Sequence, residues 1–240
     1  MTNNTSLGKL YLIPVTMGES DPMDVLPQTV KRTIELIDHY IVENEKTARK
    51  SIKGVLPEKK QSELVLFALN KHTDAKEHLS FIQPLLAGKN MGLMSEAGCP
   101  GVADPGAVIV KLAHEKGIQV IPLVGPSSIL LAMMASGMNG QSFTFNGYLP
   151  IDKGEKKSAL KNFEKLSFDK NQSQIFIETP YRNNKLLEDI LQALQPSTHL
   201  CIATDITLPT EYIKTLRVTD WKKTKVDLHN RPTIFIIHKM

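Results

Sequence analysis

Short apolar runs alternate along the chain with longer segments in which apolar residues recur every three or four positions. The short runs have the length of buried strands, and the longer segments have helical periodicity. Strands that alternate with helices favour an α/β fold. We expect strands over 10–15, from 41 onward, and over 64–69, 91–94, 118–123, 143–145, 174–179, 199–204, 211–218 and 233–238.

The helical segments fall between these strands. We expect helices over 27–38, 79–86, 107–116 and 127–137, around 159–166, and from a cap at Asn183 to just before Pro196. Pro84 must kink or end the second of them. Five strands on either side of about residue 125 predict two α/β domains in tandem, over 1–125 and 126–240.

The composition is that of a globular chain with a substantial core. Of the 240 residues, 41% are hydrophobic and 22% are charged, which excludes a disordered chain. The apolar run Ile129–Met134 is far shorter than the roughly 20 residues of a membrane span. The start Met1–Gly8 lacks the order of a secretory signal, and the cysteines are Cys99 and Cys201 alone. We therefore expect a cytoplasmic protein without a structural disulfide or a membrane anchor.

The net charge is mildly positive, at +4 from 29 Lys and Arg against 25 Asp and Glu. Such a balance permits a polyanionic partner without requiring one. Basic residues gather over 46–60, over 153–165 and again over 222–231. The ordinary interpretation of such runs is a solvated surface, and a nucleic-acid partner needs support from other features.

The segment Ser95–Gly106 concentrates residue types that form ligand loops. It follows an expected strand, precedes an expected helix and holds three glycines, two prolines and two acids. Ligands of open α/β sheets collect at the carboxyl ends of strands, where glycines let the backbone approach them. Glu96 and Asp104 can accept hydrogen bonds from a hydroxyl or an amine, but they disfavour a phosphate, and no nucleotide-binding glycine pattern is present. An ordinary turn-rich connection is the alternative.

Several segments, in chain order, resemble motifs of the tetrapyrrole methylase superfamily. Ser95–Pro100 with Asp104–Gly106 resembles its Ser-Asp-Ala-Gly-Thr-Pro and Asp-Pro-Gly loop. Three further matches are to its small-subunit rRNA cytidine 2′-O-methyltransferase branch. Residues 122–127 with 135–138 are similar to Pro-Leu-Pro-Gly-Pro and Ala-Ala-Gly-Leu, residues 145–150 to Gly-Phe-Leu-Pro, and residues 175–182 to Phe-Tyr-Glu-Ser-x-His-Arg.

The resemblance implies two tandem α/β domains of the tetrapyrrole methylase type with a cofactor cleft between them. It also implies a homodimer that uses S-adenosylmethionine as methyl donor. By position it assigns these cofactor contacts: Met17, Ser95, Glu96, Gly98, Cys99, Val102, Asp104, Ser127, Ser128, Ile177, Ala203 and Pro232. Glu96 stands where the family has Asp.

The loops expected to face the acceptor depart from the branch pattern. Residues 14–19 read Pro-Val-Thr-Met-Gly-Glu instead of Pro-x-Pro-Ile-Gly-Asn, and residues 43–49 differ from Glu-Asp-Thr-Arg. A ribose hydroxyl is a poor nucleophile that benefits from a base or a positive group. Weak catalytic candidates are Glu19, Glu43, Arg49, His39 and His72, each of which is more often structural. The cysteines and histidines have no metal-site spacing, and Cys99 has no partner that would make it a nucleophile.

Three functions stay open. Methylation of a ribose 2′-hydroxyl of small-subunit rRNA is favoured by the branch motifs and the basic segments, with Arg49, Lys50 and Lys53 expected to contact phosphates. The altered acceptor loops favour methylation of a tetrapyrrole or another small molecule. The third is a non-catalytic nucleic-acid-binding relic, which the intact Gly and Pro of the cofactor loops argue against.

Overall fold

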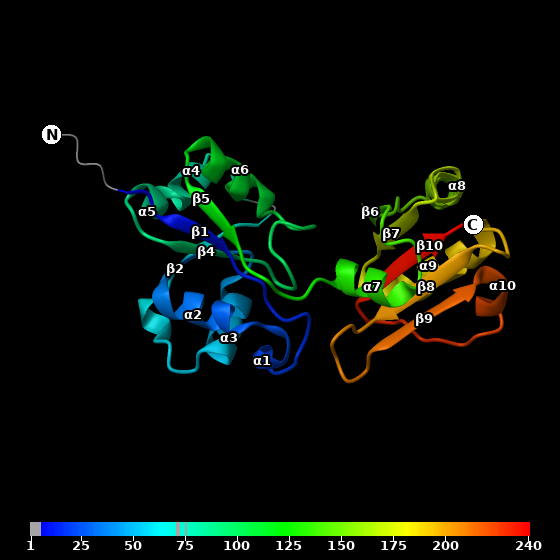
Figure 1. Ribbon diagram of the computed structural model, residues 1–240, viewed down its shortest axis with the longest axis horizontal. Coiled ribbons are helices and arrows are strands. Elements are labelled where there is room, and N and C mark those ends of the chain that lie inside the picture. The colour runs from blue at the N-terminus through cyan, green and yellow to red at the C-terminus, as the bar shows by residue number, and fades with distance from the viewer. Residues whose placement is uncertain (1–5, 71–72, 75) are drawn as a thin grey trace. The chain divides into compact units, whose positions relative to one another are not determined.

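The computed structural model describes residues 6–70, 73–74 and 76–240, and the chain divides into two compact units between Ser127 and Ser128. Within the described residues each unit holds one five-stranded sheet with helices packed on it (Figure 1). The expected α/β class is thereby confirmed.

The first unit has an all-parallel sheet. Its elements are β1 (Lys9–Leu12), α1 (Pro22–Val25), α2 (Gln28–Leu36), β2 (His39–Val42), α3 (Glu45–Val55), the 3₁₀ turn η1 (Gln61–Glu63), β3 (Val65–Ala68), α4 (His78–Phe81), α5 (Gln83–Leu86), β4 (Met91–Met94), α6 (Ala107–Glu115) and β5 (Gln119–Pro122). The strand order is β3-β2-β4-β1-β5, and every neighbouring pair is parallel. The carboxyl ends of all these strands therefore lie at one edge of the sheet. The strands β2 and β4 are neighbours, but the chain runs from β2 to β3 on one side of this pair and from β4 to β5 on the other. Ligand crevices of open α/β sheets form where the strand order reverses in this way.

Helices cover both faces of this sheet (Figure 1). On one face Tyr40 packs in a core with Ile52 of α3 and with α2. The next residue, Ile41, points to the opposite face and packs with Ile109 of α6 and with α4 and α5. This alternation is the period of two that a strand buried on both faces requires. The helices therefore leave the edges of the sheet, where the loops lie, as the places open to a ligand.

Helix α3 is an element that the sequence analysis did not predict. The side chain of Asn44 accepts two backbone N–H groups of its first turn, as an N-cap does. Ala48, Ile52 and Val55 form its buried stripe, while its other positions carry mainly lysine and polar residues. The basic run over 46–60 is thus in part the solvated face of an amphipathic helix.

The second unit has a mixed sheet. Its elements are α7 (Ser128–Ser136), β6 (Phe143–Tyr148), α8 (Lys153–Lys170), β7 (Ser173–Ile177), the 3₁₀ turn η2 (Pro180–Arg182), α9 (Asn183–Ala193), β8 (His199–Thr204), β9 (Tyr212–Arg217), α10 (Val218–Trp221) and β10 (Thr233–His238). The order is β6-β7-β10-β8-β9, with β6 and β7 parallel and the other pairs antiparallel. Helices α8, α9 and α10 pack on one face around Phe176, Trp221 and Phe235. On the other face Thr215 of β9 donates a hydrogen bond to the carbonyl of Ser136 in α7 at 2.7 Å.

Two expectations about helix ends have different outcomes. Pro84 does interrupt the helix expected over 79–86, which consists of α4 and α5. Asn183 is not the cap of α9, so that prediction is wrong. Its side chain is buried and donates to the carbonyl of Arg231 at 2.7 Å, while Arg182 holds the cap position without a side-chain capping bond to the helix. The residues directly before Asn183 form a short 3₁₀ turn, η2.

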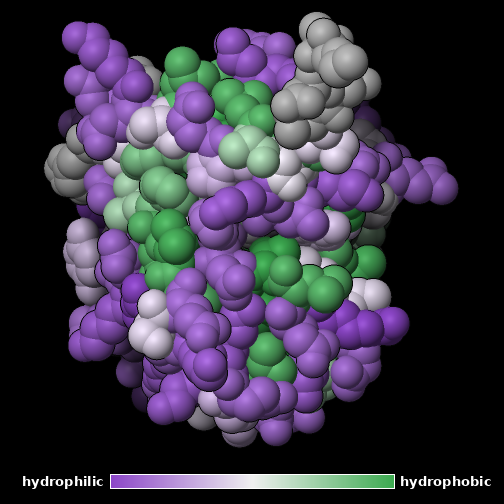
Figure 2. All heavy atoms as spheres, turned by 90° about the vertical axis from the view of Figure 1, so that its left-hand side faces the viewer, coloured by the Kyte–Doolittle hydropathy of each residue, from purple (hydrophilic) through white to green (hydrophobic). Residues whose placement is uncertain are grey.

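Figure 2 shows one face of the first unit, which is mostly hydrophilic with several separate hydrophobic patches. Large apolar side chains exposed on this unit include Leu36 and Leu79. Scattered residues of this kind are ordinary on a globular protein. Among the residues that the structure describes, no helix is both long and apolar enough to cross a membrane.

Candidate functional site

Three loops meet at the carboxyl edge of the first sheet, after β1, β4 and β5. The N–H of Val15 donates to the carbonyl of Gly98 at 3.0 Å, and the two residues form an isolated antiparallel bridge. On the other side the Cys99 thiol donates to the carbonyl of Pro126, with 3.3 Å between sulfur and oxygen. The Ser95–Gly106 loop is therefore held by its neighbours on both sides.

Two glycines give this loop its backbone path. Gly98 and Gly101 have φ of +67° and +83°, the left-handed region that other residues adopt at a cost. A Cβ on Gly98 would lie 3.4 Å from the carbonyl oxygen of Pro126 and 4.0 Å from Cγ of Met17. A Cβ on Gly101 would meet no described atom within 4 Å. The backbone at Gly101 is thus open to a ligand, whereas Gly98 is packed against Met17 and the loop after β5.

Asp104 organises the same loop from within. Its carboxylate accepts the N–H of Gly101 through both oxygens, at 2.9 and 2.8 Å, and the N–H of Gly106 at 2.7 Å. Burial raises the pKa of Asp104, and these backbone bonds act in the opposite direction. Asp104 thus shapes the loop, and much of its hydrogen-bonding capacity is already used.

Glu43 lies beside this loop, at the crevice between β2 and β4. A small pocket there is lined by Glu43, Ser95 and Asp104 together with apolar residues of both strands. Burial raises the pKa of Glu43, the charges of Glu96 and Asp104 raise it further, and a bond from the backbone of Glu96 opposes them. Glu96 itself is exposed and accepts a 3.4 Å hydrogen bond from the hydroxyl of Thr47. These carboxylates can accept hydrogen bonds from hydroxyl or amine groups, and they repel phosphate.

Two other catalytic candidates involve helix α3: Glu19 contacts it, and Arg49 is part of it. Glu19 is exposed and pairs with Lys50 at 2.6 Å, a hydrogen bond that lowers the pKa of Glu19. Arg49 donates from Nη1 to the carbonyl of Gln61 at 2.6 Å. Since Gln61 precedes β3, Arg49 is engaged in holding the connection after α3. Lys53 is exposed on the same helix.

The histidine candidates do not join this group. His39 is the first residue of β2 and so lies at the amino edge of the sheet, away from the loops. Burial lowers its pKa, and the charge of Lys89 adds to that effect. His72 lies outside the described residues.

The remaining first-unit candidates lie in or next to the loops already described. Val102 is exposed within the Ser95–Gly106 loop, and Ser127 follows the loop after β5. Of the second-unit candidates, Ile177 in β7 and Ala203 in β8 both pair with Ile234 of β10, one on each side. Pro232 directly precedes β10, so these candidates gather at one edge of the second sheet, and Ser128 begins α7.

An aromatic and basic cluster lies at the end of β6 and after β7 and was not predicted. Tyr148 and Tyr181 are 60% and 61% exposed. The guanidinium of Arg182 lies 5.4 Å from the ring centroid of Tyr181 and donates to the buried Glu178 at 2.7 Å. The motif over 175–182 contains Tyr181 and Arg182, but the family resemblance assigns only Ile177 of this segment to the cofactor. Exposed rings beside a fixed guanidinium can stack on a planar group.

The described part of the chain shows no candidate metal site. Its His, Cys, Asp and Glu side chains form no group of three or more arranged to hold an ion.

Comparison with known proteins bears directly on this arrangement. The family model described as Tetrapyrrole (Corrin/Porphyrin) Methylases matches residues 9–221. Curated relatives named ribosomal RNA small subunit methyltransferase I are similar over most of the chain. The protein from Buchnera aphidicola (Schizaphis graminum) is 27% identical over 99% of this chain and 80% of its own length. The one from Escherichia coli O157:H7 is 30% identical over 88% of this chain and 69% of its own length.

Solved structures share the fold at lower identity. The methyltransferase CobJ matches with a TM-score of 0.65 and 14% identity, covering 97% of this chain and 94% of that one. Uroporphyrin-III C-methyl transferase from Thermus thermophilus, solved in complex with S-adenyl homocysteine, matches with a TM-score of 0.56 and 16% identity, covering 97% and 98%. The expected superfamily and the expected methyltransferase class are confirmed. The chain belongs to the tetrapyrrole methylase family.

Proposed function

We propose that this methyltransferase transfers a methyl group from S-adenosylmethionine to a ribose 2′-hydroxyl in RNA of the small ribosomal subunit. The observation that carries the proposal is the Ser95–Gly106 loop, which its neighbours hold beside Glu43 at the crevice between β2 and β4. The names of the curated relatives supply the substrate class.

The residues at this edge suit S-adenosylmethionine by their chemistry. Acidic side chains attract the sulfonium of the cofactor by charge and can accept hydrogen bonds from its ammonium and ribose hydroxyl groups. The cofactor has no phosphate for them to repel. Glu96 is exposed for such a contact, and the backbone at Gly101 leaves room that a Cβ would fill. Met17 adds an apolar contact beside Gly98. From the second unit, Ser128, Ile177, Ala203 and Pro232 stay predictions of the family resemblance.

When bound, S-adenosylmethionine supplies a methyl group already activated by its sulfonium. The protein then has to align the acceptor oxygen and exclude water. Transfer forms an O–CH₃ bond, breaks the S–CH₃ bond and releases the hydroxyl proton. We assign acceptance of that proton to Glu43. Its raised pKa makes it a better base than Glu19, whose pKa Lys50 lowers.

The direct test incubates the protein with methyl-labelled S-adenosylmethionine and unmodified small ribosomal subunits, followed by mapping of the label. We expect label on a single ribose of the rRNA. Label that appears only with a tetrapyrrole or another small molecule would replace the RNA proposal. Saturating S-adenosylmethionine should also raise the melting temperature, since a ligand at a hundredfold excess over Kd stabilises the fold by ~2.7 kcal/mol. A melting curve moved by NAD or ATP instead would contradict the cofactor.

Two further implications of the family belong to the same proposal. We expect a homodimer in solution, which sedimentation at micromolar concentration checks, and a cytoplasmic location, which fractionation of cells checks. A monomer at all concentrations would contradict the first.

A further inference from the structure

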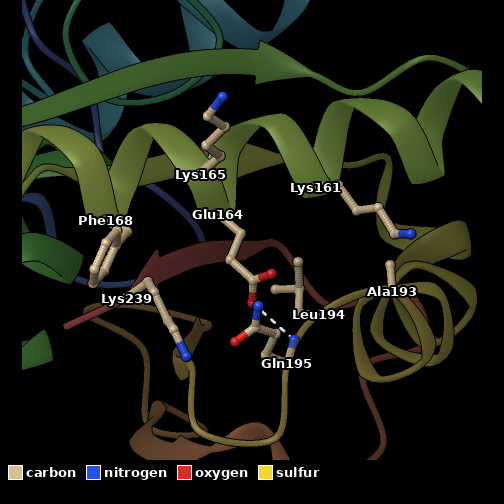
Figure 3. Close-up of a pocket in the computed structure, with 8 residues that line it drawn as sticks. All are labelled: Lys161, Glu164, Lys165, Phe168, Ala193, Leu194, Gln195 and Lys239. Carbon is tan, nitrogen blue, oxygen red and sulfur yellow. Dashed lines mark hydrogen bonds between the residues drawn. The ribbon is translucent and has the colours of Figure 1, made fainter.

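A pocket of about 590 Å³ lies on the second unit, between α8 and the turn after α9 (Figure 3). Lys161, Lys165 and Phe168 of α8 line one side, and Lys239, which follows β10, lines another. Because β10 is antiparallel to β7 and β8, this pocket lies where those two strands begin. The predicted cofactor contacts of this unit lie at the opposite edge of the sheet.

A row of unpaired lysines leads along α8 to the pocket. Lys157, Lys161 and Lys165 are spaced by four and therefore share one face of the helix, over about 12 Å of its axis. All three are exposed, and none is in an ion pair with another described residue. Figure 3 shows Lys161 and Lys239 on opposite sides of the pocket, whereas the Lys165 amine points away from it toward solvent.

Glu164 is the single acid among the residues that line the pocket, and its carboxylate does not neutralise the lysines that a ligand would meet. Glu164 is buried, and its carboxylate accepts the N–H of Gln195 at 2.8 Å, drawn dashed in Figure 3. The hydroxyl of Thr198 donates to the same oxygen. Glu164 therefore ties the turn after α9 to α8, and the accessible charge of the pocket is positive.

Phe168 adds an aromatic surface at the rim. Its side chain is 62% exposed, so the ring is accessible from solvent beside the lysines. Proteins that bind single-stranded nucleic acid combine such features: cations that follow the phosphates and exposed rings on which bases stack. The carboxylates at the first unit's carboxyl edge repel phosphate, so cations on the second unit would add to the binding of a phosphate chain.

We propose that this pocket and the lysine row of α8 bind an unpaired segment of the RNA substrate. Lys161, Lys165 and Lys239 contact its phosphates, and Phe168 stacks on a base. The inference rests on the proposed RNA substrate and adds a binding surface on the second unit.

The test compares two triple variants that remove the same charge. One carries Lys161→Gln, Lys165→Gln and Lys239→Gln. The control carries Lys222→Gln, Lys223→Gln and Lys225→Gln, three exposed lysines of the same unit that do not line the pocket. Affinity for a single-stranded fragment of small-subunit rRNA is measured across a series of salt concentrations.

We expect the pocket triple to weaken RNA binding by at least tenfold near physiological salt. It should also flatten the log–log salt slope by about 2, at ~0.7 per lost phosphate contact. A triple with Arg at the three pocket positions should bind like the wild type, and Phe168→Ala should weaken binding with no change of slope. A pocket triple that behaves like the control triple overturns the inference. Equal melting temperatures of the variants exclude misfolding as the cause.

Methyl transfer separates this inference from the proposed function. If the wild type methylates RNA and the pocket triple has an unchanged KM for RNA, the pocket inference alone fails. If the wild type methylates no RNA, the proposed function fails, and the salt slopes still decide whether the pocket binds RNA. We expect a raised KM for RNA with an unchanged kcat and an unchanged affinity for S-adenosylmethionine.

Discussion

The carboxyl edge of the first sheet and the α8 pocket of the second unit are built in opposite ways. At the first, Gly98 and Gly101 take positive φ, and Asp104 ties backbone N–H groups together. At the second, Lys161 and Lys165 project from regular helix into solvent. The first region therefore depends on backbone shape and on carboxylates at the loop, and the second depends on exposed positive charge.

This difference separates the kinds of ligand that each region can hold. Glu43, Glu96 and Asp104 disfavour phosphate at the first edge and suit hydroxyl and amine groups. The lysines of α8 suit phosphate and discriminate little between ligands that carry it. One protein can thus hold a compact cofactor and a long polyanion without competition between them. Substitutions in the first region should therefore change the stability, its pH dependence and the catalytic rate. Substitutions in the second should change the salt dependence of RNA binding.

The largest effect is expected from Glu43→Gln. Removing a general base typically costs 10²- to 10⁴-fold in rate, so kcat for methyl transfer should fall in that range. RNA affinity and its salt slope should stay as in the wild type, because Glu43 is not part of the basic surface. Single-turnover rates with saturating cofactor give the measurement. A loss of less than tenfold would remove Glu43 from the chemistry.

The same variant has an effect on stability whose sign follows from the pKa. The folded-state pKa of Glu43 is raised above its ordinary value of 4.5, so between the two values the folded chain binds more protons than the unfolded one. The free energy of unfolding therefore falls as the pH rises through that window. Glu43→Gln should lessen this fall and raise the melting temperature at pH 7 slightly. Melting curves between pH 4 and 7 compare the two proteins, and an identical pH dependence would contradict the expectation.

Shape dependence at the first edge is tested by Gly125→Ala. A Cβ at Gly125 would lie 2.2 Å from Cγ of Pro14, where backbone and ring must move apart. We expect a loss of about 3 kcal/mol in the free energy of unfolding, at the upper end for overpacking. Gly140→Ala is the matched control, since no described atom lies within 4 Å of its added Cβ. Denaturant titration measures both, and equal losses would show that the loops after β1 and β5 are less tightly packed than the structure has them.

In the second region, Glu164 fixes the local backbone by hydrogen bonds rather than by charge. Glu164→Ala leaves the N–H of Gln195 and the hydroxyl of Thr198 without their acceptor, which should cost about 2 kcal/mol. Glu164→Gln keeps an acceptor oxygen and should cost less. RNA affinity should not fall in either variant, because this carboxylate faces protein donors. An RNA affinity that falls with the Gln variant would make Glu164 part of the binding surface.

The smallest effect is expected at Cys99. Burial raises the pKa of its thiol, which therefore stays protonated and donates to the carbonyl of Pro126. Cys99→Ser keeps a donor at this position and should change the free energy of unfolding by less than about 1 kcal/mol. Iodoacetamide should modify Cys99 of the native protein much more slowly than in urea. Rapid native modification would show a reactive thiolate instead.

Much of the fold follows from apolar periodicity, and its failures have physical causes. The strands over 91–94, 199–204 and 233–238 have the expected bounds because buried strands read as continuous apolar runs. Helix α3 was missed since only Ala48, Ile52 and Val55 are apolar among many lysines. The order of strands within each sheet depends on contacts between distant segments, which no local pattern records.

The candidate site divides in the same way. Glycine spacing and acids indicated the Ser95–Gly106 loop, because such residues are required by the backbone itself. That Arg49 bonds to Gln61 could not be read from the sequence, since the partner lies beyond the end of an unpredicted helix. The α8 pocket also needs Lys239, which is 74 residues beyond Lys165 in the chain. Proximity of this kind exists only in the folded unit.

The position of β10 has a consequence for how the protein is made. Strand Thr233–His238 lies in the middle of the second sheet, between β7 and β8, although it is synthesised after the other described strands of that sheet. The strands of the first sheet are complete once Pro122 has left the ribosome, so that unit can fold while translation continues. Until Thr233–His238 emerges, β7 and β8 expose unpaired edges to the cell. A ribosome that stalls shortly before these codons would therefore display one finished unit and one with an open, aggregation-prone sheet.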